Sequence, residues 1–187
     1  MLYIVEAALD GSETDEEWDA WVGDMKPPRI ILSVPGVGSA QRFKGVGMRP
    51  AAYLALYSVA RAAVLQTPRY FGVGGGRLGT RPDRWNGRVR FWRRDLFSGL
   101  RDAPAIGPDQ RIAILDRRAD EGGETSPAGL PFRWLRIAGL DRSTALRGLA
   151  VLTAAEADSF SPGVVPGLRL YRPIMPRQLP SRSASSI

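Results

Sequence analysis

The sequence predicts an α+β fold built from ferredoxin-like units, and two observations support this fold class. In the first hundred residues, the segments follow one another in the order strand, helix, strand, strand, helix, strand, which is the split β-α-β arrangement of a ferredoxin-like unit. After residue 108, strand-forming segments resume in a similar order with the first helix missing. We therefore expect two units in tandem within one chain, although no sequence identity between the halves proves a duplication.

The first strand and the first helix have clear signals. Residues 2–9 form a short, partly β-branched apolar run that ends at a turn-forming Asp-Gly-Ser sequence, which predicts a strand. Thr14 followed three residues later by Glu17 is a capping box, which predicts the start of a helix. Lys26-Pro27-Pro28 must interrupt that helix, because proline lacks the amide donor and disfavours helical geometry in the residue before it.

The remaining elements follow from alternation, apolar runs and turn residues. Short helices are expected within residues 60–70 and 153–160. We expect a first unit at residues 1–103, a second, degenerate unit at 108–175 and a flexible polar tail at 176–187. Further strands are predicted at residues 39–47, 51–60, 87–97, 111–118, 132–143, 145–154 and 167–174.

The composition excludes several kinds of chemistry. The chain contains no histidine and no cysteine, so it has no imidazole base, no thiolate nucleophile and none of the usual ligands of a transition metal. A glycine pattern at Gly74, Gly76 and Gly79 has the spacing of a dinucleotide fingerprint, but Thr80-Arg81-Pro82 cannot readily begin the helix that this motif requires. We therefore expect no cofactor and no metal.

The expected compartment follows from segments that the sequence lacks. No apolar run approaches the length of about 20 residues that a spanning helix needs, and no basic region precedes the apolar N-terminal stretch, as it would in a signal peptide. We expect a cytoplasmic protein without a membrane partner.

The positive charge is unevenly distributed along the chain. The formal net charge is +7, yet residues 1–24 hold eight acidic residues and no basic one. Almost all of the basic residues are arginines, scattered over many segments, and no nucleic-acid recognition motif accompanies them. Nucleic-acid binding by a basic protein is therefore kept only as the weaker alternative.

Glu6 is the most anomalous residue of the first strand. A carboxylate in an otherwise apolar strand is costly to bury unless it is protonated or paired, and Arg42 or Lys44 on a neighbouring strand is the predicted partner. Glu6 is therefore either a catalytic acid or base or one half of a salt bridge at the rim of a sheet.

Two further strands carry side chains that suit a small ligand. Tyr53 and Tyr57 lie on one face of the third strand, where they either line a cavity or fill the core. Trp92 and Arg94 share one face of the fourth strand, where arginine beside an aromatic ring suits an anionic or aromatic ligand. The alternative is an ordinary surface face with Arg94 paired to an acid.

A set of motifs resembles a known family over roughly residues 1–100. The residues that carry the resemblance are Trp18 and Trp21 in an acidic helix, the string SVPGVGSAQRF at residues 33–43, and a strand ending in WRRDLF at residues 92–97. These features resemble the EthD-like branch of the dimeric α+β-barrel superfamily. The resemblance implies antiparallel sheets that close a barrel, and a small molecule held between sheet and helices.

The resemblance also shapes the expected function. Active members of the family commonly place a histidine after the first helix, whereas this chain has Lys26 in that region. We expect a cofactor-independent small-molecule enzyme or accessory protein of degradative or secondary metabolism, either monomeric or homodimeric, or else a non-catalytic ligand-binding protein of the same fold. The expected catalytic residues are Glu6, Tyr57 and Lys26, and the expected ligand-binding residues are Tyr3, Arg42, Tyr53, Trp92 and Arg94.

Overall fold

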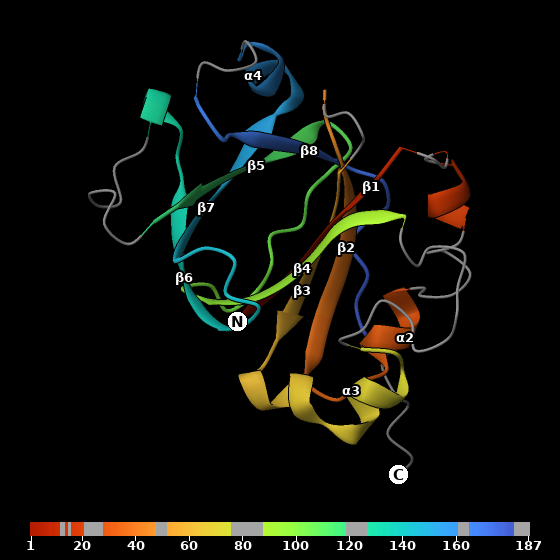
Figure 1. Ribbon diagram of the computed structural model, residues 1–187. Helices are drawn as coiled ribbons and strands as arrows, with labels where there is room; N and C mark the ends of the chain where they lie inside the picture. Colours follow the sequence, from red (N-terminus) through yellow and green to blue (C-terminus); the bar gives the residue numbers. More distant parts are fainter. Residues whose placement is uncertain are drawn as a thin grey trace.

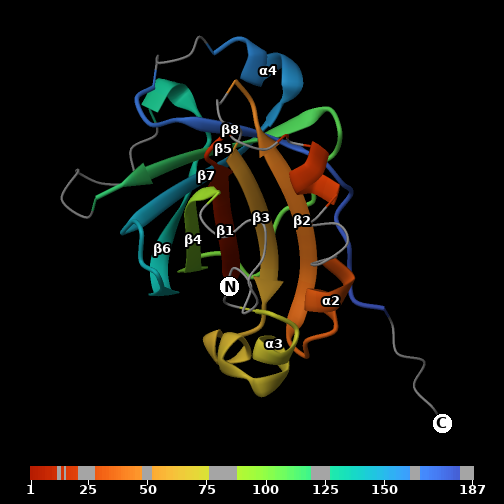
Figure 2. The same cartoon turned by 45° about the vertical axis from the view of Figure 1, so that its right-hand side comes forward.

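Eight antiparallel strands close into a barrel in the computed structural model of the chain (Figures 1 and 2). The structure describes residues 1–11, 14, 16–20, 28–47, 52–75, 88–118, 127–160 and 165–181. Around the barrel the strand order is β1-β3-β2-β8-β5-β7-β6-β4, and β4 pairs with β1 to complete the circle. The strands are β1 (Leu2–Leu9), β2 (Val37–Gly45), β3 (Ala52–Val59), β4 (Val89–Ser98), β5 (Gln110–Arg117), β6 (Arg133–Leu140), β7 (Leu146–Thr153) and β8 (Arg169–Pro173).

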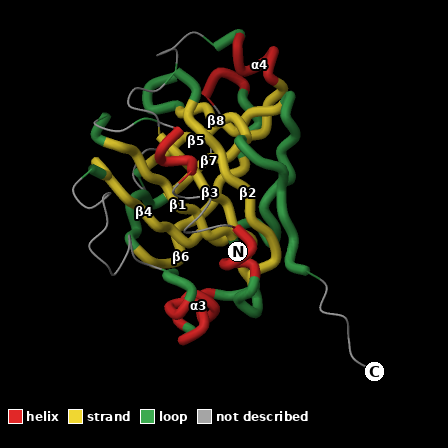
Figure 3. Tube along the Cα trace, turned by 90° about the vertical axis from the view of Figure 1, so that its right-hand side faces the viewer, coloured by secondary structure: helices red, strands yellow, loops and turns green. Residues whose placement is uncertain are grey.

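The helices are short and lie outside the barrel. Residues 16–20 are helical, and the predicted capping box is confirmed, because Glu17 N donates to Thr14 Oγ1 at 3.2 Å and Thr14 N donates to Glu17 Oε2 at 3.0 Å. Helices α3 and α4 lie on opposite sides of the molecule (Figures 1 and 3). The other helical elements are α2 (Pro28–Leu32), η1 (Ala62–Gln66), α3 (Pro68–Gly72), η2 (Pro127–Gly129) and α4 (Ala154–Asp158). The predicted α+β class with an antiparallel barrel is confirmed.

The two halves of the chain contribute four neighbouring strands each. The first half has the spatial order β4-β1-β3-β2 and the second half has the order β8-β5-β7-β6. Two pairings join the halves: Phe43–Gly45 of β2 pairs with Tyr171–Pro173 of β8, and Asp95–Ser98 of β4 pairs with Arg136–Leu140 of β6 across a register shift. One chain therefore supplies every strand of its barrel.

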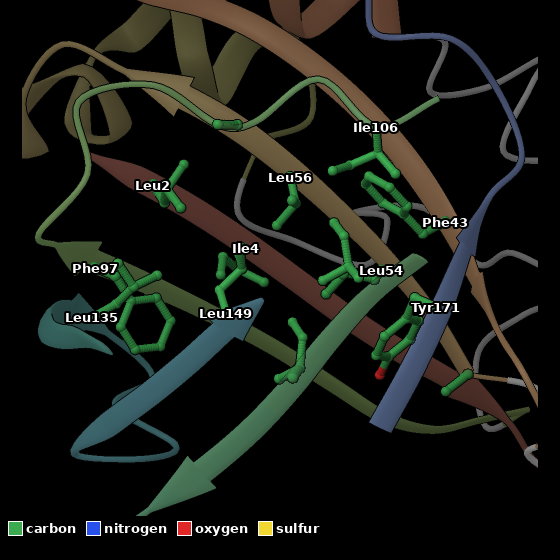
Figure 4. Packing of buried hydrophobic residues seen from close by; sticks show 14 of the residues in the cluster. Leu2, Ile4, Phe43, Leu54, Leu56, Phe97, Ile106, Leu135, Leu149 and Tyr171 are labelled. Atoms are coloured by element: carbon green, nitrogen blue, oxygen red, sulfur yellow. The ribbon is translucent and has the colours of Figure 1, made fainter. Parts of the chain in front are cut away.

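Large apolar side chains fill much of the barrel interior (Figure 4). They come from both halves, because side chains alternate between the two faces of each strand. The buried cluster contains Leu2, Ile4, Ala8, Phe43, Ala52, Leu54, Leu56, Phe97, Ala103, Ile106, Ile112, Ile114, Leu135, Leu149 and Tyr171.

The linker between the halves closes one end of the barrel. It runs from the end of β4 to the start of β5, and its Ala103 and Ile106 belong to the interior cluster. Gln41 of β2 holds it, since Gln41 Nε2 donates to Ile106 O at 2.7 Å and Ile106 N donates to Gln41 Oε1 at 3.1 Å. The buried amide thus satisfies backbone groups that would otherwise lack partners.

The chain continues along β2 after β8. Ile174 N donates to Arg42 O at 3.0 Å, and Gln178 N donates to Ala40 O at 2.8 Å. The first residues of the predicted tail are therefore bound to the barrel. Among the described residues, no helix has the length and apolar character needed to cross a membrane.

Replacing Gln41 with leucine should destabilise the fold. The change removes the partners of two buried backbone groups of Ile106, and each unsatisfied group costs about 1–3 kcal/mol, so we expect a loss of about 2–4 kcal/mol. Urea unfolding measures the free energy. The matched control is Gln66→Leu at an exposed position of η1, and equal losses in both variants would contradict the role of Gln41.

Candidate functional site

Because side chains alternate along each strand, the predicted site residues are divided between the two faces of the sheet. The side chain of Glu6 lies in the interior, where it contacts Tyr171 and Arg147. Lys26 lies outside the described residues. The remaining predicted residues are on the outer face: Tyr3, Arg42, Tyr53, Tyr57, Trp92 and Arg94. The structure therefore brings six of the predicted residues together and separates Glu6 from them.

Two arginines mark the ends of one row across the outer face. In the strand register, Arg42 lies opposite Ala55, Ala55 lies opposite Val5, and Val5 lies opposite Arg94. The side chains of Arg42 and Arg94 are 13% and 24% exposed, so solvent reaches both guanidinium ends of the row. The two residues between them are the half-buried Ala55 and the buried Val5, and Val5 belongs to an apolar cluster that also contains Leu32 and Tyr70.

Each arginine of this row is held by a carboxylate. Arg42 Nη2 lies 3.2 Å from Asp19 Oδ1, which belongs to the helical residues 16–20. Arg94 Nη2 lies 2.9 Å from Asp141 Oδ1, and the backbone N–H of Arg94 donates to the other oxygen of Asp141, also at 2.9 Å. These pairs fix the orientation of both guanidinium groups.

Tyrosines occupy the row on one side of the arginines. Tyr57 of β3 lies opposite Tyr3 of β1, and their rings stack with centroids 5.4 Å apart. The hydroxyl of Tyr70 in α3 donates to the hydroxyl of Tyr3 at 2.9 Å. Burial raises the pKa of Tyr57 to about 12, and burial together with the neighbouring Tyr70 raises the pKa of Tyr3. Both phenols are thus neutral at physiological pH and can donate hydrogen bonds.

A second aromatic row lies on the other side of the arginines. In this row Tyr53 lies opposite Ala7, and Ala7 lies opposite Trp92. Trp18 from the helical residues 16–20 packs on Tyr53 with ring centroids 5.7 Å apart. The outer face thus has a row with an arginine at each end between two aromatic rows, which suits a flat ligand that carries oxygen atoms.

Glu6 belongs to a separate cluster of charges inside the barrel. Glu6 Oε2 lies 2.9 Å from Arg147 Nη2, Glu6 Oε1 lies 3.3 Å from Arg169 Nε, and the hydroxyl of Tyr171 donates to Glu6 Oε1 at 2.9 Å. The prediction that Arg42 or Lys44 pairs with Glu6 is wrong. Both of those side chains come from the outward-facing positions of β2, whereas two arginines of the second half reach Glu6 from across the interior.

Asp116 completes the neutralisation of these arginines. Arg147 Nε and Nη2 donate to its two oxygens at 2.6 Å and 3.0 Å, and Arg169 Nη2 donates to it at 2.7 Å. Burial alone would raise the pKa of Asp116, but the hydrogen bonds and charges of the two arginines outweigh burial and lower it. Arg147 itself is fully buried, so its charge depends on these carboxylates.

A third carboxylate borders the cluster. Asp95 of β4 lies 3.7 Å from Arg147 Nη2, and it accepts hydrogen bonds from the backbone N–H and the hydroxyl of Ser143. The sequence signal for this cluster is a charged residue in an otherwise apolar strand. It singled out Glu6, and Arg147 interrupts an apolar strand in the same way. Within the described residues, no three Asp or Glu side chains are grouped so that they could hold a metal ion.

Comparison with known proteins identifies a structure with a similar fold. The chain is similar to the crystal structure of an anthrone oxidase-like protein, with a TM-score of 0.55, 15% sequence identity, and coverage of 100% of this chain and 96% of that chain. No protein-family model and no curated protein matches the sequence. At this level of identity the likeness shows a related small barrel fold.

Tyr57 and Tyr3 of the outer face should titrate at a higher pH than an exposed tyrosine. We expect the phenolate absorbance of Tyr57 to appear near pH 12 rather than near the ordinary value of 10. Because the folded state retains a proton that the unfolded chain releases, the free energy of unfolding should fall as the pH rises from about 10 to about 12. Tyr57→Phe should reduce this dependence, and a phenolate that titrates near pH 10 in the folded protein would contradict the burial of Tyr57.

Proposed function

We propose that the outer face of the first-half sheet binds a small aromatic molecule, and that the chain is a small-molecule enzyme or accessory protein of degradative or secondary metabolism. The observation that carries this proposal is the row from Arg42 to Arg94 between two aromatic rows. The ligand would need no resident cofactor to be held, because the side chains supply both hydrogen-bond donors and flat apolar surfaces.

The dimensions and chemistry of the row define the ligand class. Arg42 and Arg94 are three strand spacings apart, which corresponds to about 14 Å between their Cα atoms. Fused aromatic rings could lie over Ala55, flanked by Tyr57 and Trp92, with their ketone or phenol oxygens toward the guanidinium groups. Arginine favours such oxygen acceptors, and a neutral tyrosine adds a donor without adding charge.

The structural neighbour suggests a specific probe for this site. Anthrone is a flat tricyclic ketone, and its oxidation by dioxygen to anthraquinone releases one molecule of water. The size and polarity of the proposed ligand match a molecule of this kind. We therefore propose an oxidation of an anthrone-like ketone as the first reaction to test, with Tyr57 as the described catalytic candidate at the site.

A non-catalytic binding protein is the second candidate, and one observation favours it. The described carboxylates next to the outer row are Asp19 and Asp141, and each is paired with an arginine. Tyr3 and Tyr57 are neutral at physiological pH, and Glu6 points into the barrel. Lys26, the other expected catalytic residue, lies outside the described residues. The described part of this face thus offers better groups for holding a ligand than for removing a proton from it.

We also propose a tandem arrangement for the chain, with ferredoxin-like units at residues 1–103 and 108–175, a tail at 176–187, and a distant relation to the EthD-like proteins. The matching strand orders of the two halves support the repeat. Because one chain supplies all eight strands, a second copy is unnecessary for closing the barrel, and a monomer or a homodimer that pairs through other surfaces fits this arrangement.

Filling the middle of the outer row should weaken binding. In Ala55→Leu, the added side chain would occupy the space between Arg42 and Arg94, so quenching of tryptophan fluorescence by anthrone should require at least about tenfold more ligand. The matched control is Ala138→Leu on the exposed outer surface of β6, which should bind like the wild type. Equal affinity of both variants and the wild type would contradict the proposed site.

The same samples separate an enzyme from a binding protein. Anthraquinone formation and dioxygen uptake above the rate without protein, lost in Ala55→Leu, would support an enzyme. Saturable binding without turnover would support the binding protein. The absence of both binding and turnover would exclude anthrone-like ketones as ligands of this face.

A further inference from the structure

The turn between β6 and β7 carries the carboxylate that holds Arg94 on the outer face. It joins two strands of the second half, yet its hydrogen bonds reach β4 of the first half. Asp141 N donates to Arg94 O, Arg94 N donates to Asp141 Oδ2, and Arg94 Nη2 donates to Asp141 Oδ1, each at 2.9 Å. The carboxylate is thus fixed against the guanidinium through both the backbone and the side chain of Arg94.

The backbone of this turn is strained on both sides of Asp141. Leu140 has a φ of 68° and Arg142 has a φ of 52°, and among the described residues these two are the non-glycine residues with a left-handed φ. A side chain disfavours this conformation, which persists only where the surrounding contacts hold it. Ser143 supplies such contacts, because its backbone N–H and its hydroxyl both donate to the buried Asp95 of β4. The strained turn therefore holds Asp141 in place against Arg94.

The carboxylate of Asp141 offsets the charge that Arg94 presents to a ligand. The two side chains form an ion pair, as Asp19 and Arg42 do at the other end of the row. An anionic ligand at Arg94 would meet a carboxylate already held by the same guanidinium, and like charges at such a short separation repel each other. A neutral ketone or amide oxygen is not repelled, and it accepts hydrogen bonds from a guanidinium without adding charge.

We propose that Asp141 determines the specificity of the outer face, so that its Arg94 end selects neutral oxygen atoms and rejects carboxylates. The inference rests on the function proposed for this face, and it narrows the ligand class to uncharged aromatic molecules. Asp141 acts through Arg94 as a positioning residue: its hydrogen bonds set the direction of the guanidinium group, and its charge sets the charge that the ligand can carry.

Two ligands that differ in charge test this selection. Anthraquinone-2-carboxamide and anthraquinone-2-carboxylate have the same rings and nearly the same size, and only the second is charged at neutral pH. Quenching of tryptophan fluorescence at constant ionic strength gives both dissociation constants. We expect the wild type to bind the carboxamide at least about tenfold more tightly than the carboxylate. Asp141→Asn should shift this ratio at least about tenfold toward the carboxylate, because asparagine keeps an acceptor for Arg94 N and removes the charge.

Asp158→Asn is the matched control for net charge. Asp158 is an exposed carboxylate in α4, which packs on β5 and β7 of the second half. Its replacement changes the net charge by the same amount as Asp141→Asn and should leave the ratio of the two dissociation constants unchanged. Lys44, whose Nζ lies 5.8 Å from the centroid of the Tyr53 ring on the outer face, is present in all three proteins, so its attraction for the carboxylate cancels. Equal shifts in the two variants would overturn the proposal.

The remaining outcomes separate this inference from the proposed function. Binding of both ligands that weakens in the same proportion in Asp141→Asn would give Asp141 a structural role and overturn the selection, while the outer site would stand. A wild type that prefers the carboxylate would overturn it as well. Binding of neither ligand to the wild type, or binding of the carboxamide that Ala55→Leu does not weaken, would contradict the proposed function itself and the selection with it.

Discussion

The pairing of the buried Arg147 guanidinium with carboxylates is the interaction on which the barrel depends most. It comes from β7 of the second half, and it pairs with Glu6 of the first half and Asp116 of its own half. A buried arginine is tolerated only when carboxylates surround it, and removing either partner leaves an uncompensated charge. Since β7 and β1 are not neighbours in the barrel, this ion pair across the interior links strands that main-chain hydrogen bonds do not join.

Packing and charge pairing inside the barrel are the reason why the proposed site lies on the outer face. Apolar side chains and the linker fill one part of the barrel, and the ionic cluster fills much of the rest. We therefore place the proposed aromatic ligand on the outer face, where Arg42 and Arg94 lie at the ends of one row.

Much of the fold follows from local sequence signals. The capping box at Thr14 and the predicted strands agree with the structure, since these features depend on neighbouring residues. Alternation also implied that Glu6 could not share a face with Tyr3, because the two residues are three positions apart in one strand. The partners of Glu6 were not predictable in this way, because Arg147 and Arg169 are more than 140 residues away in the chain, and only the closed barrel brings them together.

A double-mutant cycle on Glu6 and Arg147 tests the importance of this link most directly. Unfolding in urea would be measured for the wild type, Glu6→Gln, Arg147→Met and the double variant. Each single change should lower the free energy of unfolding by about 3 kcal/mol, because it leaves a buried charge unpaired. The loss in the double variant should be about 2 kcal/mol smaller than the sum of the two single losses. Additive losses would show that the two side chains do not stabilise one another and would contradict a barrel joined by their pairing.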